Sequence, residues 1–118
     1  MPVIEISTLP TSDDIDLSSA LGEVATEVAG FLGEEPRGTW AIHRPIAPGS
    51  YAEGRDAPRS QPGETHPAIV RVLANREPQE VSGLLRAVGD AVVRAFGLEE
   101  GNVVVLWEPA DPDRMFWG

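Results

Sequence analysis

The chain of 118 residues contains no cysteine, so disulfide bridges, thiolate metal sites and a cysteine nucleophile are all excluded. It also contains no lysine. All nine basic residues are arginines, and with 19 acidic residues they leave a net charge of −10. Because nucleic acid is a polyanion, this charge disfavours it as a partner.

Long hydrophobic runs are absent as well. No apolar stretch of the sequence approaches the roughly 20 residues that a membrane-spanning helix needs. The short, charged start does not resemble a signal peptide. We therefore expect no membrane partner and a cytoplasmic location. The apolar share of 42% and the clear periodic segments favour a single folded domain.

The first part of the chain predicts a strand, a helix and a second strand. Apolar and polar side chains alternate over residues 2–8, which indicates a strand with one buried face. Apolar residues then recur at helical spacing over residues 15–32, and Gly33 is expected to end this helix. Residues 39–44 form the second strand. A strand–helix–strand connection implies that the two strands are parallel.

The second part repeats this pattern. A strand is expected over residues 67–72, followed by a helix whose cap lies at residues 75–78, with Pro78 suited to the first turn. Gly97 is expected to end this helix. Residues 102–107 form the last strand, which is apolar throughout and is therefore expected to be covered on both faces.

These elements predict an α+β fold of two layers: a tandem β-α-β repeat with a four-stranded sheet and both helices on one face. One domain spans residues 1–118. It consists of a first β-α-β unit (1–46), a long loop (47–66), and a second unit with the C-terminal tail (67–118). The second face of the sheet would be uncovered, so we expect an oligomer that seals it.

Pro2 is the first candidate for chemistry. If Met1 is removed, the ring nitrogen of Pro2 changes from an amide into a secondary amine, which can take up and release protons. A strand would hold that amine in place, whereas a frayed terminus would not. The catalytic interpretation depends on removal of Met1, and many chains begin with Met-Pro without using the proline in catalysis.

Arg76 is the candidate for binding an anion. It lies close to the expected start of the second helix, where the helix dipole and free amides add to its positive charge. His43 and His66 are single and far apart, so we expect no metal site. The sequence has no phosphate loop and no dinucleotide fingerprint, and we expect no cofactor.

A β-α-β repeat whose first strand opens with Met1-Pro2 resembles the tautomerase superfamily. This superfamily includes 4-oxalocrotonate tautomerase, macrophage migration inhibitory factor, cis-3-chloroacrylic acid dehalogenase and malonate semialdehyde decarboxylase. The resemblance covers essentially the whole chain in architecture. It implies a homotrimer in which the processed Pro2 is the general acid or base.

The resemblance also implies candidate pocket residues. Arg76 matches one of the arginines that bind the substrate carboxylate in the dehalogenase and decarboxylase members. Tyr51 lies where a loop aromatic approaches the proline in the short tautomerases. Similarities to the decarboxylase branch, in a His-Arg-Pro tripeptide and in the C-terminal pattern, add Arg44, Glu108 and Phe116.

Together these observations predict a cofactor-independent isomerase that transfers a proton between the keto and enol forms of a small 2-oxo or unsaturated carboxylate. Two alternatives stay open. A protonated Pro2 would instead serve hydration or decarboxylation of a three-carbon acid. A member without catalytic activity would be a trimeric binding or structural protein.

Overall fold

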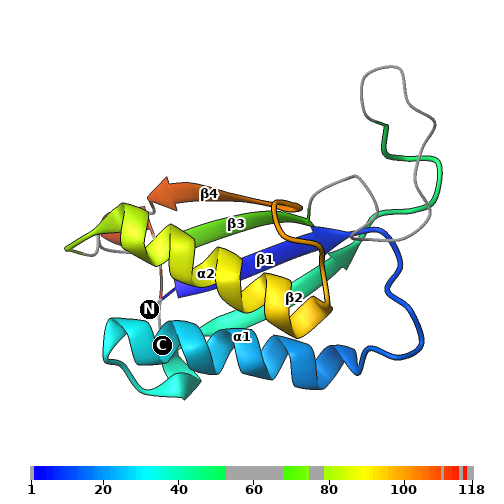
Figure 1. Ribbon diagram of the computed structural model, residues 1–118. Helices are drawn as coiled ribbons and strands as arrows, with labels where there is room; N and C mark the ends of the chain where they lie inside the picture. Colours follow the sequence, from blue (N-terminus) through cyan, green and yellow to red (C-terminus); the bar gives the residue numbers. More distant parts are fainter. Residues whose placement is uncertain (1, 53–67, 75–78, 110, 115, 117–118) are drawn as a thin grey trace.

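Four strands form one sheet, and two helices cover one of its faces (Figure 1). The computed structural model describes residues 2–52, 68–74, 79–109, 111–114 and 116. The elements, in chain order, are β1 (Pro2–Thr8), α1 (Leu17–Leu32), η1 (Pro36–Gly38), β2 (Trp40–Pro45), β3 (Ala68–Ala74), α2 (Val81–Phe96), β4 (Val103–Pro109) and η2 (Pro112–Arg114), where η marks a 3-10 turn.

The order of the strands in the sheet is β2-β1-β3-β4. β1 pairs with β2 in parallel, and β3 pairs with β4 in parallel. The two halves of the chain meet through the antiparallel pair of β1 and β3 at the centre. The predicted tandem β-α-β repeat, with both helices on one face, is confirmed.

The ends of the helices follow the capping residues. Asp16 precedes α1, and its carboxylate accepts a hydrogen bond from the backbone N–H of Ser19. Gly33 and Gly97 end the two helices with φ of 67° and 64°, a left-handed conformation that glycine adopts without steric cost. α2 begins at Val81, later than the sequence suggested, and the expected cap at residues 75–78 lies outside the described residues.

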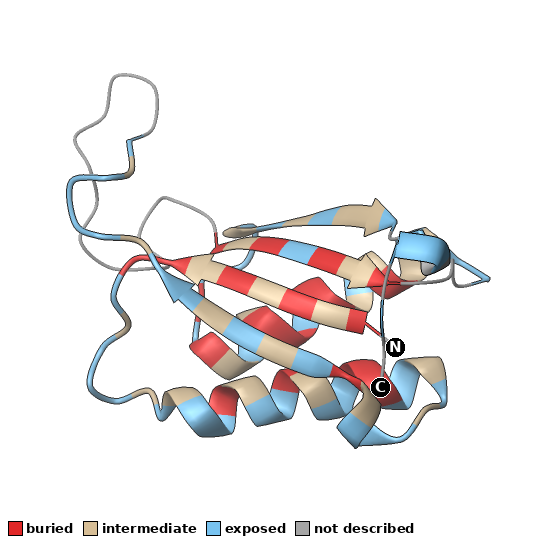
Figure 2. Cartoon of the chain, turned by 180° about the vertical axis from the view of Figure 1, so that it is seen from behind, coloured by how far each residue is buried: buried red, intermediate tan, exposed pale blue. Residues whose placement is uncertain are grey.

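The hydrophobic core lies between the sheet and the helices. Figure 2 shows buried and more exposed residues alternating along β1 and β3, as expected for strands with one covered face. The fully buried side chains of these two strands include Ile4, Ile6, Val70 and Val72. They pack against the inner faces of the helices, which contribute Val24, Val28, Leu84, Val88 and Val92.

The other face of the sheet, which we call the open face, carries three side chains from each strand. Strand register arranges them in three rows: Trp40, Val3, Leu73 and Glu108; Ile42, Glu5, Arg71 and Leu106; and Arg44, Ser7, Ile69 and Val104.

Within a single chain, the prediction that the last strand is covered on both faces is wrong. β4 is an edge strand, and on its open face Val104 and Leu106 stay 38% and 47% exposed. Its apolar sequence therefore reflects two different surfaces: one packs on α2, and the other faces away from the helices.

Candidate active site at the Pro2 end of the sheet

Pro2 lies at the end of the sheet where several elements meet. β1 and β2 begin there, β3 and β4 end there, and the last turn of α1 and the first turn of α2 approach the same end (Figure 1). Pro2 is level with Ala74 of β3, which in turn is level with Pro109 of β4. Pro2 is buried on the helix-covered side of the sheet.

Thr39 directly precedes β2 and adds a polar group to this end. Because Val3 is level with Trp40, the next residue back along the parallel pair places Thr39 beside Pro2. Thr39 is only 4% exposed, whereas Trp40 is exposed. The hydroxyl of Thr39 has no hydrogen-bond partner among the described residues. Sequence reasoning did not single out this residue, since threonine before a strand is ordinary.

The open face carries a chain of ion pairs that crosses all four strands. Glu5 accepts hydrogen bonds from Arg44 at 3.2 Å and from Arg71 at 2.8 Å. Arg71 also donates to the Glu108 carboxylate, with Nη2 2.6 Å and 2.7 Å from its two oxygens. These contacts raise the pKa of Arg71, first through its hydrogen bond with Glu108 and also through Glu5. The four residues, Arg44, Glu5, Arg71 and Glu108, are called the ionic ladder below.

Two of the predicted site residues, Glu108 and Arg44, belong to the ionic ladder within one chain. Glu108 lies at the Pro2 end but on the open face, where it binds Arg71. Arg44 is level with Ser7, five residues from Pro2 along β1. At about 3.3 Å per residue this separation is roughly 16 Å, and the two side chains lie on opposite faces of the sheet.

The other predicted residues are spread along the chain. Tyr51 is partly buried in the segment that follows β2, at the far end of the sheet from Pro2. Phe116 is 94% exposed in the C-terminal tail. Arg76 lies outside the described residues. Within the described part of the sheet, the neighbours of Pro2 on the helix-covered face are Ala74 and Thr39, whereas the two arginines of the sheet, Arg44 and Arg71, lie on the open face.

The fold was compared with known proteins. No family model matches the sequence, and no curated protein sequence matches it. Solved structures do match. Native fused 4-OT has a TM-score of 0.81 and 9% identity, covering 98% of this chain and 92% of that one.

Two further structures agree over nearly the whole chain. Macrophage migration inhibitory factor from Toxoplasma gondii has a TM-score of 0.71 and 14% identity, covering 98% of this chain and 96% of that one. Pt0534 inactivated by 2-oxo-3-pentynoate has a TM-score of 0.76 and 15% identity, covering 96% and 89%. This is the tautomerase-superfamily fold.

At the opposite end of this tautomerase fold lies a second polar contact. The Thr8 hydroxyl donates to the Leu9 carbonyl at 2.7 Å and lies 2.8 Å from His43 Nε2. Because that hydroxyl has a single hydrogen, Nε2 of His43 must donate to it. The His43 ring also stacks on Phe96, with ring centroids 6.0 Å apart. Burial lowers the pKa of His43, which favours the neutral form of the ring.

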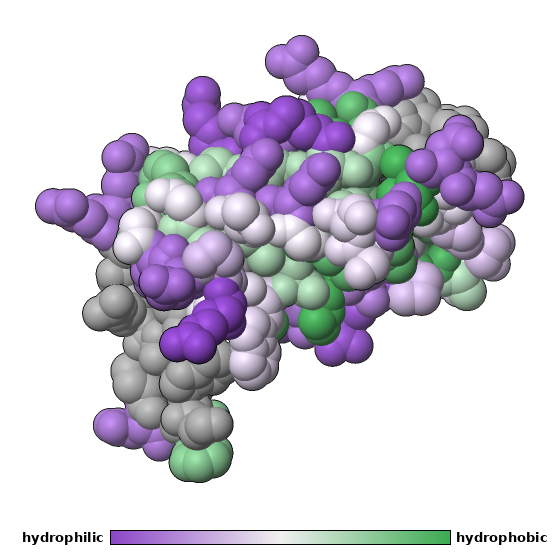
Figure 3. Space-filling model, turned by 90° about the horizontal axis from the view of Figure 1, so that it is seen from below, coloured by the Kyte–Doolittle hydropathy of each residue, from purple (hydrophilic) through white to green (hydrophobic). Residues whose placement is uncertain are grey.

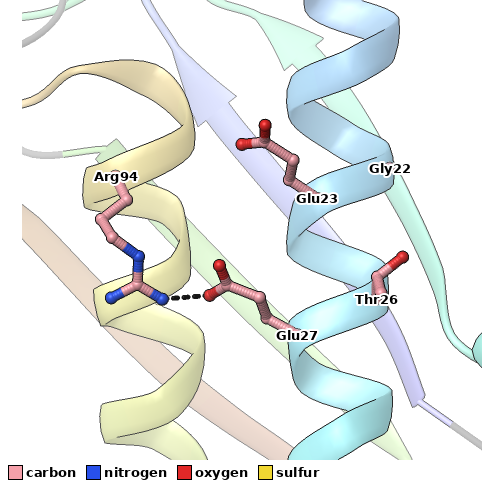
Figure 4. Close-up of a pocket in the computed structure, with 5 residues that line it drawn as sticks. All are labelled: Gly22, Glu23, Thr26, Glu27 and Arg94. Carbon is pink, nitrogen blue, oxygen red and sulfur yellow. Dashed lines mark hydrogen bonds and ion pairs between the residues drawn. The ribbon is translucent and has the colours of Figure 1, made fainter.

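A shallow groove of about 650 Å³ lies between α1 and α2 (Figure 4). It is lined by Gly22, Glu23, Thr26, Glu27 and Arg94. Arg94 and Glu27 form an ion pair across it. Figure 3, a view from the α1 side, shows a band of white and pale green residues, of intermediate hydropathy, between hydrophilic side chains. The groove is open, and Arg94, the cation that lines it, is paired with Glu27.

The described part of the chain contains no group of three histidine or acidic side chains that could hold a metal ion. Neither α1 nor α2 is long and apolar enough to cross a membrane.

Proposed function

We propose that this chain belongs to the tautomerase superfamily and, once Met1 is removed, uses Pro2 as a general acid and base. The reaction is keto–enol proton transfer on a small 2-oxo or unsaturated carboxylate. The observation that carries the proposal is the position of Pro2. It is the first residue of a central strand, buried at the end of a sheet whose fold matches tautomerase structures.

Burial supports this chemistry. A secondary amine among apolar neighbours has its charged form disfavoured, so its pKa falls toward neutrality. Such an amine accepts a proton from the carbon beside a carbonyl and returns it at another atom of the same conjugated system. The amine is neutral before the first step and neutral again after the second, so the reaction needs no cofactor.

The carboxylate of the proposed substrate is chosen because an arginine can bind it. A guanidinium binds a carboxylate through two parallel hydrogen bonds, and it stabilises negative charge that develops on a neighbouring oxygen. We assign this role to Arg76. One matching structure, Pt0534, is inactivated by 2-oxo-3-pentynoate, a 2-oxo acid, which supports the same class for this chain.

The position of Arg44 bears on how the chain assembles. Within one chain it lies roughly 16 Å from Pro2 along the sheet and on the opposite face. If it contacts the substrate bound at Pro2, it must come from a neighbouring subunit. Fused 4-OT forms trimers, and we propose a homotrimer here, closed through the open face. Tyr51, Glu108 and Phe116 are the remaining candidate pocket residues.

The test is ketonisation of phenylenolpyruvate by the wild-type chain and by Pro2→Ala, after intact mass has established that Met1 is absent. Acid–base catalysis by a side chain contributes about 10²- to 10⁴-fold, so Pro2→Ala is expected to lose activity on this scale. Pro10→Ala, which changes an exposed proline just after β1, is the matched control and should keep wild-type activity.

A chain with residues fused before Met1 keeps Pro2 as an amide and should be as inactive as Pro2→Ala. Equal rates in the wild-type chain, Pro2→Ala and the extended chain would remove Pro2 from the mechanism. Decarboxylation of a three-carbon acid, without ketonisation, would move the chain to the other enzymatic branch.

A further inference from the structure

Two buried polar side chains occur among the described residues, Thr8 and Thr39, and they differ in one respect. The Thr8 hydroxyl is fully satisfied by the Leu9 carbonyl and by His43. The Thr39 hydroxyl is equally buried, but within the described part of the chain it contacts no donor or acceptor. A buried hydroxyl without a partner is destabilising, so its presence calls for an explanation.

The position of Thr39 supplies an explanation for this unpartnered hydroxyl. Its backbone is extended, with φ of −110° and ψ of 122°, so the alternation of β2 continues back into it. Trp40 faces the open side of the sheet, and Thr39 therefore faces the helix-covered side, as does Pro2. Neighbouring strands lie about 4.8 Å apart, which brings the Thr39 side chain within one strand spacing of the Pro2 ring.

We propose that Thr39 is a positioning residue for Pro2, and that its hydroxyl hydrogen-bonds the secondary amine that Pro2 carries as the N-terminal residue. This inference rests on the proposed function for its catalytic meaning, although the hydrogen bond can be tested without any substrate. In a chain that keeps Met1, the Pro2 nitrogen is a tertiary amide without a hydrogen, and the hydroxyl lacks this partner.

The hydroxyl matches both states of the amine. It accepts from the protonated amine, which has two N–H groups, and it donates to the lone pair of the neutral amine. The bond to the charged form is the stronger of the two. Thr39 therefore holds the ring in one orientation through the proton-transfer cycle, and it moderates the loss of basicity that burial causes.

Within the described part of the sheet, few other groups compete for this role. The nearest charged side chains on β1, β3 and β4 are Glu5, Arg71 and Glu108, which lie on the opposite face and bind one another. On the helix-covered side at this end, the described neighbours of Pro2 in the sheet are Ala74 and Thr39. Thr39 carries the only hydroxyl of the two.

The experiment measures the titration of the Pro2 nitrogen by ¹⁵N NMR in the processed, proline-labelled chain. Thr39→Val keeps the size of the side chain and removes the hydroxyl. Losing the stronger bond to the protonated form should lower the amine pKa by about one unit. The acid limb of the kcat/KM profile should move to lower pH by the same amount. Thr39→Ser should restore both, because serine keeps the hydroxyl.

The matched control is Thr8→Val, which removes the other buried hydroxyl at the far end of β1 and should leave the Pro2 titration unchanged. Thr39→Ala gives a second variant without the hydroxyl, with the same expected shift if the valine variant folds poorly. An unchanged Pro2 titration in a folded Thr39→Val or Thr39→Ala chain would overturn the inference. So would a shift that Thr39→Ser fails to reverse. Wild-type activity in Pro2→Ala would overturn the proposed function alone, because the NMR titration does not depend on turnover.

Discussion

Leu106 offers a sharp test of whether the open face is buried between copies of the chain. It lies on edge strand β4, beside Arg71, and is 47% exposed in the single chain. Replacing it by lysine changes little within one chain, because the side chain already faces outward. In a trimer closed through this face, the same replacement places a charge in the interface and next to an existing cation.

The size of the effect follows from the exposed fraction. Full burial of a leucine side chain stabilises by roughly 1.5–3 kcal/mol, so the half still exposed corresponds to roughly 1 kcal/mol per subunit. Three symmetric copies give roughly 3 kcal/mol per trimer, which at about 1.4 kcal/mol per factor of ten is at least 100-fold in the assembly constant. Desolvating an unpaired lysine adds to this loss.

The assay is sedimentation velocity at micromolar concentration, where a trimer has three times the chain mass of 12.6 kDa. Leu106→Lys is expected to sediment as a folded monomer with unchanged circular dichroism. Thr26→Lys is the matched control, since it adds the same charge on the exposed side of α1 and should leave the trimer intact. A wild-type monomer, or a Leu106→Lys trimer as tight as the wild type, would refute burial of the open face.

Two further predictions concern the single chain. Gly33→Ala should lower the free energy of unfolding by roughly 1 kcal/mol, because alanine is strained at the φ of 67° that ends α1. Gly22→Ala within the same helix should instead raise it by roughly 0.5–1 kcal/mol. Equal effects of the two replacements in urea unfolding would contradict the capping argument. His43 should make stability depend on pH. Since burial lowers its pKa in the folded chain, its contribution is complete above the ordinary value of 6.5 and is lost as pH falls below it. The free energy of unfolding of the wild type, measured relative to His43→Gln, should therefore decline on acidification; a flat difference would mean that the ring titrates alike in both states.

Local patterns in the sequence predict much of the fold. The alternation of Ile4 and Ile6, and of Val70 and Val72, assigns the two central strands, since a strand with one covered face must alternate. Helical spacing and terminal glycines assign both helices. The strand–helix–strand order then requires parallel pairs, because a crossover through a helix brings the chain back in the same direction.

The candidate site depended on information that local patterns do not carry. Arg71 was visible only as an arginine within a strand, because its partners Glu5 and Glu108 lie 66 and 37 positions away and meet it only through strand register. The same register separates Arg44 from Pro2 within one chain. The apolar run of β4 was misleading for a related reason: hydrophobicity does not say whether a face is covered by a helix of the same chain.

The ionic ladder also resolves an apparent conflict between charge and assembly. Copies of a chain with a net charge of −10 repel one another, and repulsion would be strongest if acidic groups lined the contact. On the open face, however, Arg44 and Arg71 balance Glu5 and Glu108, so this surface is locally neutral while the rest of the chain carries the excess. The paired carboxylates are also already satisfied, so contact with another copy need not leave them without partners. The open face is therefore a surface on which this acidic chain can meet a copy of itself at low electrostatic cost. Because β1 runs through the middle of the sheet and begins at Pro2, assembly through this face would bring the Pro2 end of each chain close to its neighbours.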